Sequence, residues 1–412
     1  MQAILGIVVM VGFAWLVSEH RLAVRWRTVV VGLAIQFALA LVLLRVPAVS
    51  QTLLLLNEVV HGIERATTTG AGFVFGFLGG GPPPFEVTAE GALYLFAFRV
   101  LPQILVFSVL VALLWYWRIL PLIIHGFGLI LRRAMDLGGA VGTAAASSVF
   151  LGMVETPLVI RAYLAGLSRS ELFTLMTCGM STVAGSIMVL YASVLGNVTP
   201  GALGHILVAS VINVIGAVFV SRVMIPETIS ADAETAPEGL RYSSHMDAIT
   251  RGTVDGLRLA VNVGAMVLVL VSLVALVNQM LSVVVVADSP VTLQRIMGWA
   301  FSPVAWLIGI PWLEAQSAGA LLGTKLILNE LVAYLELAAL PEGTLSARTS
   351  LIMTYALCGF ANFGSLGIML GGLNTLVPER REELLAVAPK TLISGTLVTC
   401  NTGAVVALVT LV

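Results

Sequence analysis

Two short stretches, CGMSTVAGS at residues 178–186 and CGFANFGSL at residues 358–366, interrupt apolar regions with small and polar residues. Aligned without gaps, both have Cys-Gly followed by an apolar, a small, a polar, an apolar and two small residues. Thr182 is thereby paired with Asn362, and Gly185 with Ser365. Weak internal similarity of this kind predicts a fold built from two related halves, the alternative being a chance match in membrane-like composition.

The composition is that of a membrane protein. Of the 412 residues 58% are hydrophobic and 10% charged, and the mean hydropathy is +1.02. Because soluble domains carry roughly 25% charged residues, we expect an all-α polytopic protein embedded in a lipid bilayer. The net charge of −1 gives no indication of a nucleic-acid partner. Cys178, Cys358 and Cys400 form no CxxC or Cys/His cluster, so no disulfide, metal site or cofactor is predicted.

Continuous apolar segments occur at 3–18, 28–46, 92–117, 201–221, 257–286 and 388–412, and are predicted to be spanning helices. The first segment lacks a basic leader and a small-residue cleavage site, so we interpret it as a retained span. Residues 49–66 are expected to form an interfacial or an ordinary connecting helix. The GGGPPPFE stretch at 79–86 is expected to be a loop.

The segments 138–197 and 296–376 are apolar too, but Gly, Pro, Ser, Asn and isolated charges interrupt them. Irregular backbone at membrane depth survives only where protein or water covers its polar groups, and it often marks a binding site. We expect re-entrant hairpins at 138–166 and 296–337, because only then do all four basic loop clusters fall on one, cytoplasmic, side. Both termini are then periplasmic. The clusters are His20, Arg21, Arg25 and Arg27; Arg118, Arg132 and Arg133; Arg222, Arg241 and Arg251; and Arg380, Arg381 and Lys390.

Two acidic residues are expected at the hairpin tips, Glu155 in LGMVETPLVI (151–160) and Glu314 in GIPWLEA (309–315). A carboxylate at mid-bilayer costs about 2.5–3.5 kcal/mol, so it indicates a functional site unless the side chain reaches water at a helix end. Carboxylates can accept hydrogen bonds from hydroxyl groups such as those of a sugar, or can carry a proton.

Further candidates follow the second hairpin. Asn362 and Ser365 can supply an amide and a hydroxyl to one polar ligand, or can pack helix against helix. Phe360 can form an apolar wall for a flat ring, or can be a packing residue. For Lys325 and Glu330 we expect a structural role. Neither a nucleophile–base pair nor a metal cluster is visible, so we do not expect an enzyme.

Several motifs in order resemble the concentrative nucleoside transporter family over nearly the whole chain. They are FAFRVLP (96–102), the Glu-x-Pro of the first hairpin, GIPWLEA (309–315), LNELVAY (328–334) and ALCGFAN (356–362). The resemblance implies eight transmembrane helices plus two re-entrant hairpins, a homotrimer in the bacterial inner membrane, and an elevator-like transport domain. It also implies import of nucleosides by symport with Na+ or H+.

The resemblance also implies roles for individual residues. Glu314, Asn362 and Ser365 match positions that hold the ribose, and Phe360 matches an aromatic residue beside the base. Glu155 matches the acidic end of a first-hairpin motif that is usually Gly-Gln-Thr/Ser-Glu.

Here that motif is Gly152-Met153-Val154-Glu155. Methionine is only a weak acceptor and valine has no hydrogen-bonding group, so recognition of the base is expected to be loosened or redirected. A transporter of the same fold for another nucleoside-like or polar solute is the alternative.

The resemblance places a coupling cation at Ser148, Leu151, Thr182 and Val183. Sodium-coupled members typically have Asn where this chain has Ser148, and the loss of that donor favours H+ over Na+.

The expected domains are scaffold helices with the interfacial helix (1–137), a first transport repeat (138–223), a cytoplasmic loop (224–252), a scaffold helix (253–291) and a second transport repeat (292–412).

Overall fold

The computed structural model describes residues 1–46, 62–87, 95–135, 137–196, 198–227, 242–286 and 289–410. In this part of the chain the structure is helical, apart from two strands of two residues each that form a small hairpin, β1 (Val285–Val286) and β2 (Ser289–Pro290). Two helices precede the repeats, α1 (Gln2–Leu16) and α2 (Trp26–Arg45), with a 3-10 turn η1 (Arg21–Ala23) between them. Residues 62–75 are helical as well, and end in the 3-10 turn η2 (Gly76–Gly79).

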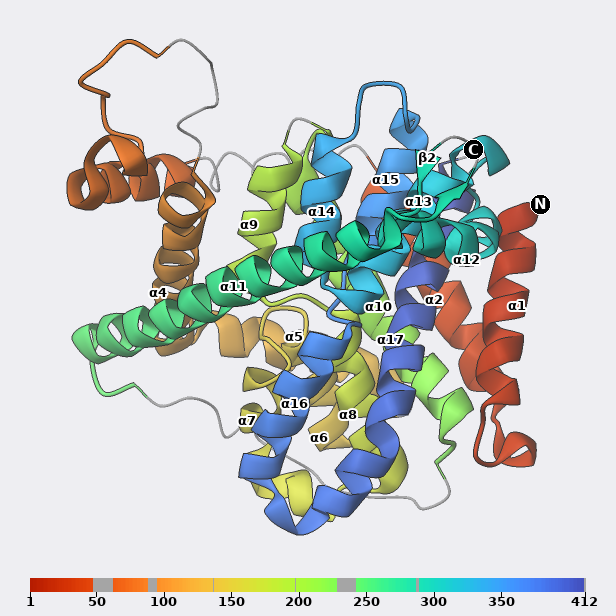
Figure 1. Ribbon diagram of the computed structural model, residues 1–412. Helices are drawn as coiled ribbons and strands as arrows, with labels where there is room; N and C mark the ends of the chain where they lie inside the picture. Colours follow the sequence, from red (N-terminus) through yellow and green to blue (C-terminus); the bar gives the residue numbers. More distant parts are fainter. Residues whose placement is uncertain are drawn as a thin grey trace.

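The remaining helices fall into two series with the same order of elements (Figure 1). The first series is η3 (a π-helical turn, Phe96–Val100), α4 (Leu101–Tyr116), α5 (Ile119–Met135), α6 (Gly139–Ser147), α7 (Glu155–Val159), η4 (Arg161–Gly166), α8 (Arg169–Ser181), α9 (Gly185–Leu195) and α10 (Ala202–Met224). The second is α11 (His245–Leu281), α12 (Leu293–Leu307), α13 (Trp312–Ile327), α14 (Glu330–Ala339), α15 (Ala347–Leu357), α16 (Phe363–Leu376), η5 (Pro378–Arg380) and α17 (Arg381–Val409).

Equivalent elements of the two series make equivalent contacts. The helix α10 packs on α8 and α9, and α17 packs on α15 and α16. In each half the helix that precedes a hairpin packs on its first arm, α5 on α6 and α12 on α13. The repeat predicted from the two Cys-Gly stretches therefore extends over almost all helices after the second.

The two halves run in opposite directions. The end of α10 lies beside Glu19, because the Met224 carbonyl accepts a 2.9 Å hydrogen bond from the Glu19 amide. The end of α17 lies at the opposite end of the molecule, where Arg45 donates to the Val409 carbonyl and Gln2 to the Ile310 carbonyl. Opposed directions are what an inverted repeat requires.

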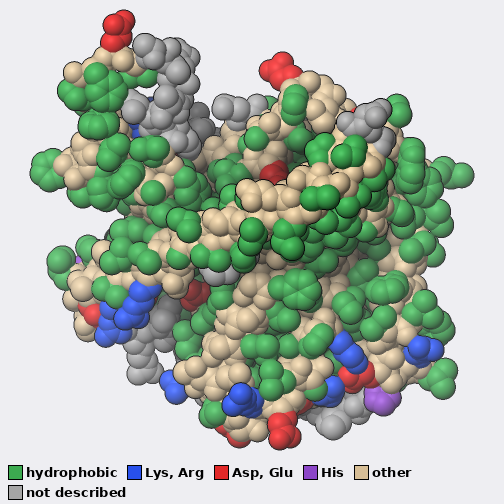
Figure 2. Space-filling view, in the orientation of Figure 1, with side chains coloured by type: hydrophobic (Ala, Val, Ile, Leu, Met, Phe, Trp, Pro, Cys, Tyr) green, Lys and Arg blue, Asp and Glu red, His purple; other side chains and the backbone are tan. Residues whose placement is uncertain are grey.

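Charge divides the molecule along the same axis. Glu19 accepts hydrogen bonds from Arg169 and Lys390, and Arg380 lies close by, bonded to Glu383. On the face shown in Figure 2, most visible Lys and Arg side chains lie in the lower half, where Figure 1 shows the beginning of α17. The α1 and α17 ends that carry the termini lie at the other end of the molecule.

Most predicted spans coincide with helices, with two differences at their boundaries. Five helices of the described chain are long and apolar enough to cross a membrane, and α12 and α13 form a bent pair at 117°. The helix α11 begins at His245, inside the stretch 224–252 expected to be a loop, because the Ser244 hydroxyl caps it by accepting from the Asp247 amide. The last helix begins at Arg381 instead of residue 388.

The expected loop at 79–86 is non-helical after Gly79. The expected interfacial helix at 49–66 lies outside the described residues except for 62–66, which are helical.

Candidate functional site

Each half contains a helix interrupted near its middle. In the first half α8 ends at Ser181 and α9 begins at Gly185, whose amide donates to the Phe150 carbonyl at 2.8 Å. The first hairpin thus satisfies a backbone donor that the broken helix leaves without a partner. In the second half α15 ends at Leu357, and Asn362 caps α16 by accepting a 2.7 Å bond from the Ser365 amide.

The two breaks lie against each other. Gly359 has a φ of +151°, and a Cβ on it would lie 2.6 Å from the Ser181 carbonyl oxygen, so a larger residue would not fit. The buried amide nitrogen of Asn213 on α10 donates to both the Ser181 carbonyl (2.8 Å) and the Cys358 carbonyl (2.7 Å). One side chain therefore satisfies backbone acceptors in both halves.

The tips of the two hairpins carry equivalent acids. Glu155 is the first residue of α7, and Glu330 is the first residue of α14, each directly after the chain reverses. Glu314 was the acid expected at the second tip, but the segment 296–337 contains two reversals, at 308–311 and at 328–329. Glu330 follows the second of these and is the structural counterpart of Glu155.

Glu330 forms the centre of a buried polar cluster. Its Oε2 accepts a 2.8 Å hydrogen bond from Asn362, and its Oε1 accepts a 2.5 Å bond from the hydroxyl of Tyr191. The three side chains are at most 4% exposed. Tyr191 belongs to α9 of the first half, whereas Glu330 and Asn362 belong to the second. The cluster therefore lies where the two halves meet.

Glu314 does not join this cluster. Its Oε2 accepts hydrogen bonds from the amide and hydroxyl of Ser346, each at 3.1 Å. Ser346 caps the beginning of α15, whereas Asn362 follows the end of that helix, and 11 residues of helix span about 16 Å. Glu314 therefore joins α13 to the start of α15, whereas the resemblance implied that it holds the ribose together with Asn362 and Ser365.

Ser365 and Phe360 lie within three positions of Asn362 in the sequence and are both buried. Ser365 is on the first turn of α16, and its hydroxyl has no hydrogen-bond partner among the described residues. Phe360 lies in the break itself, where its carbonyl accepts from the Asn362 amide at 2.8 Å. Their part in binding a ligand stays a prediction.

The first hairpin presents mainly apolar groups. Met153 packs against α8, so that a Cβ on Gly179 would lie 3.0 Å from the Met153 Cβ. Val154 packs against Gly372 of α16 in the same manner. Within residues 148–157 Glu155 alone is exposed, and the other residues are buried or half-buried. Its Oε2 lies over the backbone of Gly152. The hairpin therefore offers one carboxylate and two apolar side chains.

The four residues expected at the coupling cation lie in two segments that the structure brings together. Ser148 caps the end of α6 and Thr182 the end of α8, and both are buried. Their hydroxyls donate to the carbonyls of Ala145 (2.8 Å) and Cys178 (2.9 Å), which leaves oxygen lone pairs for a cation. Leu151 and Val183 are buried beside them in the sequence. Hydroxyl and carbonyl oxygens at two helix C-termini suit a hard monovalent cation.

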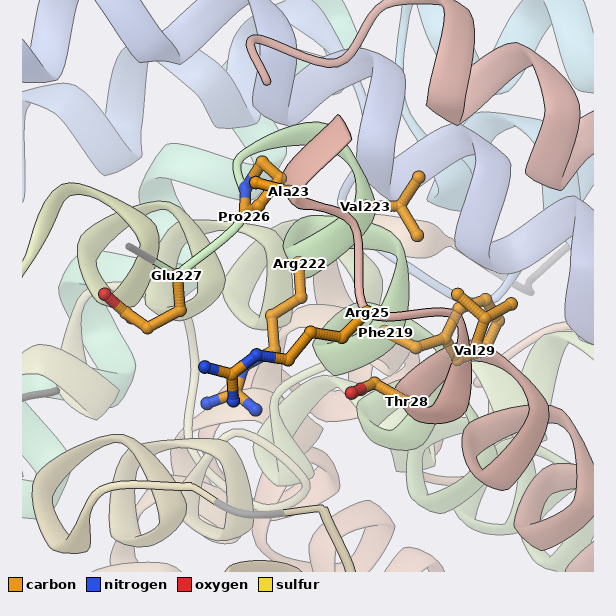
Figure 3. A pocket seen from close by; sticks show the side chains of 9 residues that line it. All are labelled: Ala23, Arg25, Thr28, Val29, Phe219, Arg222, Val223, Pro226 and Glu227. Carbon is orange, nitrogen blue, oxygen red and sulfur yellow. The ribbon is translucent and has the colours of Figure 1, made fainter. Parts of the chain in front are cut away.

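A shallow pocket at the charged end of the molecule is separate from these groups. Figure 3 shows the side chains of Arg25 and Arg222 extending toward one point in it, with Glu227 at its edge. None of the candidate substrate- or cation-binding residues described above lines this pocket. In the described chain no group of three or more His, Cys, Asp or Glu is placed to hold a metal ion.

Three of these residues, Glu330, Tyr191 and Asn213, were not predicted to belong to the site. Glu330 was assigned a structural role, and Tyr191 and Asn213 carried no signal because isolated polar residues are common in buried helices. The Asn-Glu pair at the start of LNELVAY was the available signal, since Asn329 caps α14 as a hairpin tip requires.

Two inverted halves, each with an acid-tipped hairpin against a broken helix, define a secondary membrane transporter. Three family models match the chain: Na+ dependent nucleoside transporter N-terminus (5–78), nucleoside recognition (97–198) and Na+ dependent nucleoside transporter C-terminus (205–407). The chain is 38% identical to the uncharacterised transporter YutK of Bacillus subtilis, over 96% of this chain and 95% of YutK. It is 34% identical to the nucleoside permease NupC of Helicobacter pylori, over 96% of this chain and 94% of NupC.

A solved structure, CNTnw in an inward-facing substrate-bound state, is similar with a TM-score of 0.90 and 33% identity, covering 99% of this chain and 97% of that one. The chain belongs to the concentrative nucleoside transporter family, whose members are transporters and not enzymes. The family and the helical fold predicted from the sequence are confirmed.

Proposed function

We propose that this protein is a cation-coupled symporter that imports nucleosides across the bacterial inner membrane. The observation that carries the proposal is the cluster of Glu330, Asn362 and Tyr191 where the two inverted halves meet. A buried carboxylate and amide are suited to the vicinal hydroxyls of a ribose, since each hydroxyl both donates and accepts. We assign ribose binding to Glu330, Asn362 and Ser365.

We assign the base to the opposite side of the site, beside Met153, Val154, Glu155 and Phe360. Glu155 supplies an acceptor for one N–H of the base, while the other three side chains supply apolar contact. An apolar pocket discriminates weakly between substrates that differ in polar groups. A broad preference across purine and pyrimidine nucleosides is therefore expected.

We place the coupling cation at Ser148, Leu151, Thr182 and Val183. The sequence alone favoured H+, because Ser148 replaces an amide. The oxygen groups at the ends of α6 and α8, together with the sodium-dependent description of the family, lead us to propose Na+ first and H+ as the alternative.

We also propose an orientation and an assembly, which the charge distribution and the family support. The charged end with Glu19, Arg169 and Lys390 is assigned to the cytoplasm, with both termini periplasmic. We expect a homotrimer with an elevator-type transport domain. The sequence assigned all of 1–137 to the scaffold. Because α1 and α2 pack on α17 and α10, we propose instead that they belong to the transport helices, and we group α4 with α11, on which it packs, as scaffold.

Uptake by proteoliposomes tests the proposal. A panel of purine and pyrimidine nucleosides is offered under an inward Na+ gradient or an inward H+ gradient, each applied alone. Accumulation of nucleosides driven by one gradient is expected, and no accumulation under either gradient contradicts the proposal.

The apolar pair Met153 and Val154 favours a second candidate, a transporter of another nucleoside-like or polar solute. Free nucleosides then fail to compete with the true solute. For a nucleoside carrier, Met153→Gln combined with Val154→Thr is expected to change the ratio of uridine to adenosine uptake by at least about tenfold. An unchanged ratio contradicts a role for these two side chains at the base.

A further inference from the structure

Lys325 is a buried cation that the proposed transport cycle does not use. Its side chain is 2% exposed and lies in the last turn of α13. The ammonium donates to the Ala356 carbonyl at 2.9 Å and to the Thr399 hydroxyl at 2.7 Å. Among the described residues no carboxylate lies within ion-pair distance of it. Since burying an ammonium is costly, these neutral oxygens must offset much of that cost.

This ammonium lies at the ends of the two helices that are equivalent to those assigned to the coupling cation in the other half, and also bonds Thr399 of α17. In the first half, the cation is assigned to the ends of α6 and α8, at Ser148 and Thr182. The equivalent helices of the second half are α13 and α15. Lys325 is in the last turn of α13, and Ala356 is in the last turn of α15.

Helix polarity gives both positions the same chemistry. The C-terminus of a helix carries about half a negative charge from its unpaired carbonyls, so two converging C-termini attract a cation. In the first half a diffusible cation can provide the balancing positive charge. In the second half the positive charge comes from the Lys325 side chain, which cannot dissociate.

The ammonium also fixes the ribose side of the site. It joins the hairpin α13–α14 to the end of α15, directly after which Cys358, Gly359 and Phe360 form the break. Glu330 lies five positions after Lys325, and accepts its bond from Asn362 on the far side of the same break. The contact thus holds the two segments that carry Glu330 and Asn362.

We propose that the Lys325 ammonium is a built-in counterpart of the coupling cation, which keeps the ribose-binding half of the site assembled while the first hairpin depends on a diffusible ion. This inference rests on the proposed function. It explains why a transporter with two equivalent hairpins would couple to an ion at only one of them.

Chemical rescue tests the inference. Lys325→Ala removes Cγ, Cδ, Cε and the nitrogen, which are the atoms of n-propylammonium. Binding of radiolabelled uridine and adenosine to the purified protein is measured at fixed pH and saturating Na+. The additive is n-propylammonium, n-propanol or choline, all at one concentration. The matched control is Lys390→Ala, because Lys390 pairs with Glu19 outside the site.

We expect Lys325→Ala to weaken nucleoside binding by at least about tenfold. The amine should restore most of the affinity, whereas n-propanol and choline should not. Lys390→Ala should bind nucleoside as the unchanged protein does. Equal rescue by n-propylammonium and n-propanol would show that only the lost volume matters, and would overturn the inference. Unchanged affinity of Lys325→Ala, or a loss of affinity that n-propylammonium does not restore, would overturn it as well.

A second variant covers failure of Lys325→Ala to fold. Lys325→Gln keeps a hydrogen-bonding head without charge, and we expect the same loss of affinity in a monodisperse protein. Affinity equal to that of the unchanged protein would overturn the inference. If the unchanged protein binds neither uridine nor adenosine, the proposed function fails instead, so the two failures are distinguishable.

Discussion

The amide nitrogen of Asn362 donates a 2.8 Å hydrogen bond to Oε2 of Glu330 and so joins the break of the second half to the tip of its hairpin. Because Tyr191 donates to the other oxygen of the same carboxylate, the first half is attached to this pair as well. The candidate ribose site is therefore a contact between three segments that are distant in the sequence.

Glu330 and Glu314 are expected to respond differently to substitution. Glu330→Gln replaces an acceptor-only carboxylate that Asn362 and Tyr191 both bond, and should weaken nucleoside binding by about 100-fold, or about 3 kcal/mol. Glu314→Gln is the matched control and should stay within about threefold, because Glu314 bonds only Ser346 in the described chain. Uridine binding by the purified variants measures both, and the reverse order of effects would return the ribose role to Glu314.

Thr182→Val should reduce the apparent affinity for the coupling ion by about tenfold while maximal uptake at saturating ion is kept, because one of the proposed oxygen ligands is lost. Thr396→Val removes a hydroxyl with a similar bond inside α17 and should leave the ion dependence unchanged. Ser148→Asn should raise the affinity for Na+. Initial uptake rates measured against Na+ concentration test these expectations. Identical Na+ curves for all variants would favour H+ as the coupling ion.

Asn213→Leu should destabilise the protein by about 2–4 kcal/mol, because the carbonyls of Ser181 and Cys358 both lose their buried donor. Asn213→Asp should be at least as unstable, since its carboxylate would face two carbonyl oxygens. Asn262→Leu, at an exposed position on α11, is the control and should change stability by less than about 0.5 kcal/mol. Thermal unfolding in detergent measures the differences. A stable Asn213→Leu variant would show that the two breaks do not need this link.

The charged end should contribute a pH-dependent part of the stability. The guanidinium of Arg169 and the ammonium of Lys390 lower the pKa of Glu19 to about 2. A carboxyl whose pKa is lower in the folded state stabilises the fold above its unfolded pKa of about 4.5, and that contribution disappears as the pH falls toward 2.

Glu19→Gln should therefore cost about 1–2 kcal/mol at pH 7, less than the full pKa shift implies because water screens the partly exposed partners. The cost should shrink steadily below pH 4. Melting temperatures of the two proteins between pH 3 and 7 test this, with the exposed Glu382→Gln as control. A difference that is independent of pH would rule out the ion pairs as its source.

The sequence by itself determined the class of protein. Apolar segments of spanning length, their interruption by Gly, Pro and Asn, and the Cys-Gly stretches at 178 and 358 are local features, and the helices follow them closely. Asn362, Ser365 and Phe360 were named as candidates for the same reason, since the break beside which they lie is recognisable from adjacent residues.

The tertiary structure alone decided which acidic side chain accepts a hydrogen bond from Asn362. Glu314 and Glu330 both follow a reversal of an apolar chain, and periodicity does not distinguish the two reversals. The choice depends on how α13 packs on α15, which brings residue 330 to the break and leaves residue 314 at the far end of that helix. Tyr191, Asn213 and Lys325 acquired their roles in the same way, because their partners lie in other helices that only packing brings within hydrogen-bond distance.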